Sequence, residues 1–381
     1  MNFELTEEQR ILVRNARKFL KDEIEPIADE LDRKGPMPKE VAHQFIKRLI
    51  PFGYINCCIP EKDGGMGLDH LTFGLLLEEI KKVYPSLGGI VSIAQSAAYT
   101  IATNGTDEQK KRFLPGLLSG DLIGCMGITE PNVGSDVKSI QTTAELKGDY
   151  FILNGTKMWI SNGSISDLCI VLCKTEKGLS RIIVEKKVSS YQTREIPKMG
   201  LKSFPTSEIV FDNVKVPKEN LLSEQGRGFK DVMKAFNTAR CNLAVGCVGI
   251  MQAATDASIK YAKERIQFKK QIASFQLIQD MIADMIMLTE ASRMLAYRAL
   301  YYLDRKEDAT IESSIAKSFC SESAVKVTSI AIQIHGAYGL SDEYRVERYF
   351  RDARCYTIPD GTTQIQKLII GREATGIKAF E

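Results

Sequence analysis

The chain has 381 residues, of which 44% are hydrophobic and 26% charged, so two or three globular domains with ample core are expected. Lys and Arg (51) nearly balance Asp and Glu (48), and a net charge of +3 argues against a nucleic-acid or anionic-membrane partner. The sequence shows no apolar run of 18 residues and no secretory leader. Nine Cys without a C-x-x-C pair favour free thiols in the cytoplasm, and three His disfavour a metal site.

The first third of the chain is predicted to be helical. Thr6 and Gln9 have the pattern of a capping box, and Thr106 and Gln109 repeat it. Long apolar segments cover about 70–83 and 87–103. We expect a helical domain over residues 1–123.

Residues 124–232 change to short β-rich segments separated by Gly, Asn, Ser and Pro. Asn154-Gly155 is a dipeptide typical of a tight turn, so 151–153 and 157–161 are predicted to form two strands around it. Further strands are predicted at 168–173, 181–185 and 208–211. This pattern predicts a small β-barrel or sandwich domain.

Helical periodicity returns in the last third, and the segments are long. They cover 229–265, 274–303 and 309–334, and the first contains no Pro. A C-terminal four-helix bundle over residues 233–381 is therefore predicted. The fold class is α+β, in the order helical, β, helical.

Two segments carry most of the candidate chemistry. Residues 356–366 (YTIPDGTTQIQ) present Asp360 on a Pro-Asp-Gly turn, followed by two hydroxyls and an amide. This order suits a base aimed at a substrate, beside groups that hydrogen-bond a polar cofactor. Residues 128–136 (ITEPNVGSD) offer backbone N–H groups and a hydroxyl that suit a phosphate or ribityl oxygen, although spacing alone favours an ordinary polar loop.

On these two segments, and on the α–β–α order over nearly all residues, the chain resembles the acyl-CoA dehydrogenase family. These flavoproteins oxidise the α,β bond of CoA thioesters. The resemblance implies bound FAD, with Asp360 as the proton-abstracting base and flavin N5 as the hydride acceptor. It also implies electron-transferring flavoprotein as the electron acceptor, and a homo-oligomer, commonly a tetramer.

The family pattern further implies which residues contact FAD. The flavin half would meet Met126, Ile128, Thr129, Gly134, Ser135, Trp159, Ile160, Ser161, Thr362 and Gln364. The diphosphate and adenosine half would meet Arg265, Phe268, Gln276, Gln333 and Gly336. In that family the segment around Arg265 and Phe268 reaches the flavin of a neighbouring subunit. By residue type alone, Trp159 is more often a core residue, and Arg265 could be a solvated helix end.

The resemblance implies substrate contacts at Ser135, Asn237, Arg240 and Gly361. Asn237 and Arg240 lie one helical turn apart, so both face one side. They could form a buried helix–helix hydrogen bond, or Arg240 could steady the loop that bears Asp360. One branch of the family carries its base just before this Arg. That position is Ala239 here, which leaves Asp360 as the best candidate.

The chain departs from the family in the base itself, because the family usually has Glu at the position of Asp360. Asp is shorter by one methylene, about 1.5 Å of reach. The α carbon could sit closer, Asp360 could be displaced from this role, or the reaction could fall at another carbon. Pro359 also replaces a bulky aromatic.

Small residues on the segment expected to line the acyl pocket could either widen it or let helices pack closely: Gly88, Gly89, Ser92, Ala94, Ser96, Ala97 and Ala98. Our hypothesis is a short, bulky or alicyclic acyl group, such as cyclohexane-1-carboxyl-CoA. The alternatives are a short- or branched-chain acyl-CoA dehydrogenase, an acyl-CoA oxidase, and a DNA-associated or non-catalytic flavoprotein of the same fold.

Overall fold

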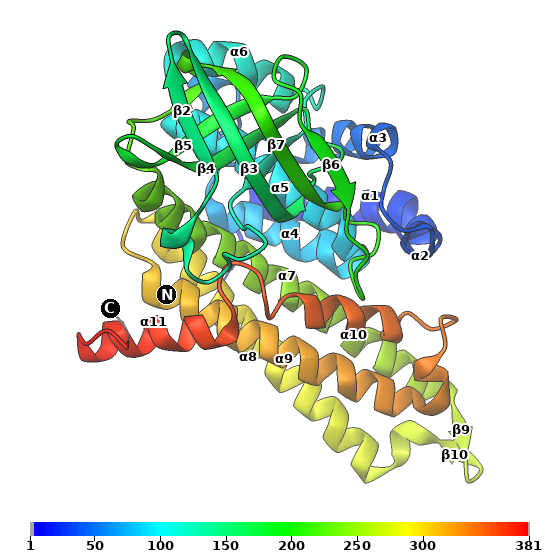
Figure 1. Cartoon of the computed structure of the whole chain (residues 1–381). Coiled ribbons are helices and arrows are strands. Elements are labelled where there is room, and N and C mark those ends of the chain that lie inside the picture. Colours follow the sequence, from blue (N-terminus) through cyan, green and yellow to red (C-terminus); the bar gives the residue numbers. More distant parts are fainter. Residues whose placement is uncertain (1–3, 380–381) are drawn as a thin grey trace.

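The computed structural model describes residues 4–379 and has three parts in chain order (Figure 1). The N-terminal part is helical, as predicted. Its helices are α1 (Glu7–Phe19), α2 (Glu25–Lys34), α3 (Lys39–Leu49), α4 (His70–Val83), α5 (Pro85–Asn104) and α6 (Asp107–Leu118). The two predicted capping boxes are confirmed, at Thr6 for α1 and at Thr106 for α6.

The middle part is one mixed sheet. Its strands are β1 (Gly124–Gly127), β2 (Thr143–Lys147), β3 (Tyr150–Ser161), β4 (Leu168–Thr175), β5 (Gly178–Glu185), β6 (Gln192–Glu195), β7 (Thr206–Pro217) and β8 (Leu221–Leu222). They lie in the order β6-β7-β3-β2-β4-β5-β8, and β1 pairs in parallel with β4. Alternate apolar side chains such as Phe151, Leu153 and Ile209 form the core beneath the sheet.

The predicted turn at Asn154-Gly155 is wrong, because β3 runs unbroken through it. The pairing of β3 with β7 shifts register between Leu153 and Gly155, which marks a bulge. Gly155 has φ 146°, and a Cβ there would lie 2.5 Å from Thr142 Oγ1. The glycine is therefore needed for a bulge and a close backbone approach, not for a chain reversal. The reversal lies earlier, where Lys147 pairs with Tyr150.

The C-terminal part is helical. It contains α7 (Gly228–Glu264), α8 (Gln276–Asp304), α9 (Thr310–His335), α10 (Val346–Cys355) and α11 (Thr363–Thr375), and the hairpin of β9 (Ile266–Gln267) and β10 (Lys270–Gln271). The three long helices run side by side, and the β9–β10 hairpin lies at the end of the bundle far from α11 (Figure 1). None of the helices within residues 4–379 is long and apolar enough to span a membrane.

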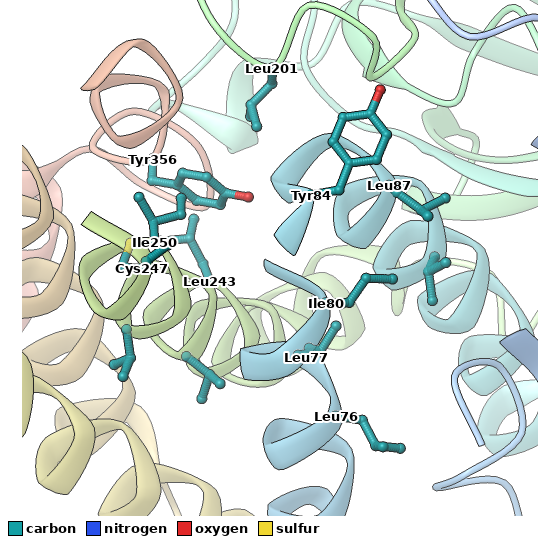
Figure 2. Close-up of a cluster of buried hydrophobic side chains, with 14 of the residues drawn as sticks. Leu76, Leu77, Ile80, Tyr84, Leu87, Leu201, Leu243, Cys247, Ile250 and Tyr356 are labelled. Atoms are coloured by element: carbon teal, nitrogen blue, oxygen red, sulfur yellow. The ribbon is translucent and has the colours of Figure 1, made fainter. Parts of the chain in front are cut away.

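The N-terminal and C-terminal parts share one hydrophobic core. Leu77 and Ile80 of α4 belong to the same buried cluster as Leu243 and Cys247 of α7 (Figure 2). Glycine makes the close packing of these two helices feasible. A Cβ on Gly249 of α7 would lie 2.5 Å from the backbone oxygen of Glu78 in α4.

Gly249→Ala should therefore force α4 and α7 apart. We expect a loss of about 1–3 kcal/mol in the free energy of unfolding, measured by denaturant titration, because the clash is with backbone. Gly371→Ala is the matched control, since it lies in α11 with no atom within 4 Å of the added Cβ. That variant should gain about 1 kcal/mol or less from helix propensity. Equal stabilities of the two variants would contradict the packing argument.

Candidate active site

A cavity of about 1480 Å³ opens where the three parts meet. Its walls come from α4 and α5, from β3 and the loop after β1, from α7, and from the segment between α10 and α11. Small-molecule sites usually measure about 300–1,000 Å³. The volume therefore suffices for more than one ligand of ordinary size.

Asp360 lines this cavity on a turn that three side chains hold in place. Its φ of 57° is left-handed, a strained backbone for a residue other than glycine. Arg240 Nε donates to the Asp360 carbonyl at 3.1 Å, and Gln366 Nε2 donates to the same oxygen at 2.9 Å. Lys317 Nζ donates to the carbonyls of Thr357 and Gly361 at 2.9 and 2.8 Å. These hydrogen bonds hold the strained turn, and with it Asp360, at one place on the cavity wall.

The same cations set the electrostatics of the acid. Burial raises the pKa of Asp360 above its ordinary value, while Lys317 and Arg240 act in the opposite direction. Burial also lowers the pKa of Lys317 to about 8, against the attraction of Asp360. Neither cation donates to the Asp360 carboxylate itself, since their hydrogen bonds go to backbone carbonyls and to Asn237 Oδ1, and its oxygens are left able to accept a proton from a ligand.

A second carboxylate, Glu130, is used structurally. It accepts hydrogen bonds from the backbone N–H of Gln141 and Thr142, from the Thr142 hydroxyl, and from Lys157 Nζ at 2.8 Å. Burial opposes its ionisation, but these hydrogen bonds outweigh that effect, and the pKa of Glu130 lies below its ordinary value. Lys157 also donates to the Ile128 carbonyl at 2.9 Å. The loop that carries Ile128 and Thr129 is therefore anchored to β3.

Trp159 is not a core residue, because 55% of its surface is exposed and it lines the cavity. Its φ is 63°, and the pairing of β3 with β7 shifts between Lys157 and Ile160. The backbone N–H of Met158 donates to the Thr129 carbonyl at 2.9 Å, so strand and loop are joined here. A large aromatic face and two segments with backbone polar groups are thus presented together to the cavity.

Asn237 and Arg240 lie together on α7, as their spacing predicts. Arg240 Nη1 donates to Asn237 Oδ1 at 3.1 Å, and Asn237 Nδ2 donates to Thr310 Oγ1 at 3.1 Å. Asn237 therefore bridges α7 and α9, while Arg240 reaches the Asp360 turn. Both of the roles left open for this pair are present in its geometry.

The cavity brings together thirteen of the catalytic, cofactor-binding and substrate-binding residues that the family resemblance implies. These are Met126, Ile128, Thr129, Gly134, Ser135, Trp159, Ile160, Ser161, Asn237, Arg240, Asp360, Gly361 and Thr362. Gly134 has no atom within 4 Å of a built Cβ, so a ligand can approach its backbone closely.

Six other residues do not line the cavity, and all six are exposed: Arg265, Phe268, Gln276, Gln333, Gly336 and Gln364. Gln364 lies on α11. The other five lie at the far end of the bundle, where the Arg265 guanidinium is 5.7 Å from the ring of Tyr338 and Phe268 is 6.0 Å from Phe275. Within one chain, these residues do not belong to the same cavity as Asp360.

Three residues that the sequence did not single out shape the site. Lys317 supports the Asp360 turn, and Lys81 and Asn242 line or back the cavity wall although each is only 4% exposed. In the sequence, such a residue can be recognised as a polar side chain at a position where helical periodicity predicts burial. Lys317, for instance, follows Ser313 and precedes Cys320 and Ala324, all buried.

Within residues 4–379, no group of three or more His, Cys, Asp or Glu side chains could hold a metal ion.

Three family models match the chain. The acyl-CoA dehydrogenase N-terminal domain matches residues 6–121, the middle domain 125–214 and the C-terminal domain 226–375.

Curated relatives match over nearly the full length. The chain is 39% identical to a 3-(aryl)acrylate reductase of Clostridium sporogenes, over 96% of this chain and 98% of that protein. It is 39% identical to a glutaryl-CoA dehydrogenase of Desulfococcus multivorans, over 99% of both. It is 38% identical to a caffeyl-CoA reductase–Etf complex subunit of Acetobacterium woodii, over 96% of this chain and 97% of that protein.

Solved structures agree in fold. The butyryl-CoA dehydrogenase of Megasphaera elsdenii superposes with a TM-score of 0.94 at 35% identity, covering 98% of this chain and all of that one. A glutaryl-CoA dehydrogenase of Mycobacterium smegmatis in complex with FADH2 gives 0.93 at 28% identity, covering 99% and 97%. The exposed ring of Trp159 and the open backbone at Gly134 fit a flat ring with a phosphate-bearing tail. The chain is an oxidoreductase of the acyl-CoA dehydrogenase family, whose members use FAD.

Proposed function

We propose that this protein catalyses the FAD-dependent α,β-dehydrogenation of a short acyl-CoA thioester to the enoyl-CoA, with Asp360 as the base. The observation that carries the proposal is the convergence of a single clamped acid, Asp360, with Trp159 and the Gly134 loop on one cavity. A thioester placed between acid and flavin would present its α hydrogen to one side and its β hydrogen to the other.

The protein's own part in the reaction is proton transfer and positioning. Asp360 would accept the α proton, and the C–H electron pair would form the new C=C bond as hydride leaves the β carbon. FAD, when bound, supplies the hydride acceptor. The backbone N–H of Asp360 is proposed to donate to the thioester carbonyl, where negative charge develops. Arg240 and Lys317 favour the ionised form of Asp360 and so oppose the rise in its pKa that burial causes.

The charge of the cavity supports a CoA ligand. Among residues 4–379, seven cationic side chains line it (Lys81, Lys138, Lys198, Arg240, Arg354, Arg372 and Lys378), against the two carboxylates of Asp136 and Asp360. Such a balance favours an anionic ligand, and CoA carries a diphosphate and a further phosphate. This excess is local, because the whole chain is nearly neutral.

The acyl pocket supports a short acyl group better than a wide one. The space that Gly88 leaves is filled by Lys81, whose Cδ would lie 2.8 Å from an added Cβ. The space at Gly89 is filled by the ring of Phe204, 2.7 Å from such a Cβ. The butyryl-CoA relative favours the short-chain alternative, and the alicyclic hypothesis gains no support from the relatives.

Electron-transferring flavoprotein is the proposed electron acceptor, since one relative is a subunit of a complex named for Etf. Relatives are named both as reductases and as dehydrogenases. The nine cysteines are all free, which supports a reducing cytoplasm as the place of action.

We also propose a homotetramer in which the far end of the bundle completes the FAD site of another subunit. This end carries exposed apolar side chains at Ile266 (59%), Phe268 (87%), Leu277 (75%) and Leu340 (76%). Exposed apolar residues gathered in this way mark interaction surfaces. The arrangement would bring Arg265, Phe268, Gln276, Gln333 and Gly336 to a partner's adenosine and diphosphate.

Asp360→Asn should abolish proton abstraction without emptying the FAD site. We expect kcat to fall by about 10²- to 10⁴-fold, the usual contribution of a general base, with flavin absorbance unchanged. In the wild type, kcat/KM should rise with pH, because the base must be ionised. The pKa of that rise should lie above that of ordinary aspartate, because burial raises the pKa of Asp360. The assay is dye reduction with butyryl-CoA and related short thioesters.

Asp360→Glu is the control, because it keeps the carboxylate and should keep measurable turnover. Full activity of Asp360→Asn would show that another group is the base. A protein that holds FAD but is not bleached anaerobically by any acyl-CoA would favour a non-catalytic flavoprotein.

Phe268→Asp should weaken assembly and, with it, FAD retention. We expect smaller species in analytical ultracentrifugation and an FAD Kd raised about tenfold or more, which corresponds to about 1.4 kcal/mol. Leu146→Asp is the control, since Leu146 is also an exposed large apolar side chain (51%) but lies on β2 of the sheet. A wild-type monomer that binds FAD tightly would contradict the proposed assembly.

A further inference from the structure

The wall of the cavity between α4 and α7 holds two polar side chains that the dehydrogenation does not use. Lys81 on α4 and Asn242 on α7 both line the cavity, and each is only 4% exposed. Most of the wall around them is apolar, with Leu201, Phe204 and Leu243 among its residues.

Lys81 is a buried cation without a carboxylate partner. Its Nζ donates to the Pro85 carbonyl at 3.1 Å and to the Tyr356 hydroxyl at 2.5 Å, and within residues 4–379 it forms no ion pair. An ammonium group has three hydrogens, so one donor remains. Burial lowers the pKa of Lys81 to about 7, and the attraction of Cys247 and Asp352 through space offsets only part of that effect. The next residue, Lys82, is paired with Asp256 at 2.6 Å, so a partner was available one position away.

Asn242 is a buried amide without a hydrogen-bond partner among residues 4–379. Neither Oδ1 nor Nδ2 has a hydrogen bond, although both atoms are inaccessible to solvent. Buried polar groups in native proteins are nearly always satisfied, and exceptions point to a missing water, ion or ligand. The two donors of this amide are free for such a ligand.

Both groups belong to one patch of wall. The Lys81 stem packs on α7 at Gly246, whose built Cβ lies 3.5 Å from Lys81 Cγ. Asn242 precedes Gly246 by four residues, so it lies on the same face of α7, one turn away. Tyr356, to which Lys81 donates, precedes Asp360 by four residues, and its ring reaches toward α4 (Figure 2). The patch therefore lies on the same wall as the turn that carries the base.

We propose that this patch, formed by Lys81, Asn242 and Tyr356, binds a carboxylate at the far end of the acyl group. The inference rests on the proposed function and narrows its substrate to the CoA monothioester of a short dicarboxylic acid. A carboxylate would accept hydrogen bonds from the free ammonium donor and from the Asn242 amide, and it would neutralise the buried charge. A hydrocarbon acyl group would leave both unsatisfied.

The test compares acyl groups of matched length in the holoenzyme. Succinyl-, glutaryl- and adipoyl-CoA are set against butyryl-, pentanoyl- and hexanoyl-CoA, and against the neutral amide of each diacid, in anaerobic flavin reduction and dye-linked turnover. We expect the best diacid thioester to exceed its hydrocarbon counterpart and its amide at least tenfold in kcat/KM. Lys81→Met should lower that ratio at least tenfold, mainly through KM for the diacid, and Asn242→Leu should lower it by a smaller factor.

Lys82→Met is the control, because Lys82 lies on the same helix but does not line the cavity. In Lys82→Met, the ratio of kcat/KM for the diacid thioester to that for its hydrocarbon counterpart should equal the ratio of the wild type. Flavin absorbance and thermal unfolding establish that each variant is folded. Preference for the hydrocarbon series at every length, or an unchanged ratio in Lys81→Met, would overturn this inference and leave the dehydrogenase function standing. Failure of every thioester to reduce the flavin would overturn both.

Discussion

The site depends on how a strained turn is held by buried cations that do not bond to its acid. Arg240 and Lys317 direct their hydrogen bonds to the carbonyls of Asp360, Thr357 and Gly361. Their charges act on the carboxylate only through space, and they oppose the rise in its pKa that burial causes. The structure thereby separates two needs, because the backbone is fixed while the carboxylate oxygens remain available. A left-handed aspartate persists because its surroundings over-determine it.

Glu130, which lies behind the loop that lines the cavity, shows the opposite use of a carboxylate. Its oxygens take hydrogen bonds from two backbone N–H groups, a hydroxyl and Lys157. A carboxylate satisfied in this way is a poor proton acceptor but a strong anchor, and its pKa lies below the ordinary value. The pair Glu130 and Lys157 joins the loop after β1 to β3, so the aromatic face of Trp159 and the backbone of Thr129 keep a fixed relation.

The sequence predicted those features of the fold that depend on neighbouring residues alone. The capping boxes, the limits of α4 and the helical–β–helical order followed from periodicity and from start signals. The turn predicted at Asn154-Gly155 is wrong because the dipeptide is only a local signal. The bulge that forms there depends on pairing with β7 and on contact with Thr142. Residues of contiguous motifs were found, but Lys81, Asn242 and Lys317 were missed. Their burial depends on packing against other elements, which the sequence of one helix does not show. Arg265 and Phe268 were predicted as site residues, but they lie outside the cavity of their own chain.

The glycines at the acyl pocket show why small residues are weak predictors of pocket size. Gly88 and Gly89 left open either a wider pocket or close packing, and their space is taken by the side chains of Lys81 and Phe204. A missing Cβ determines which other side chain can occupy the space beside the glycine. Of the two side chains that do so here, Lys81 is a cation. The character of the wall is therefore set by the side chains that fill the gap, and it is more polar than the local sequence of α5 indicates. The polar character of this wall therefore depends on two positions on different helices, since neither Gly88 nor Lys81 alone would place an ammonium group there.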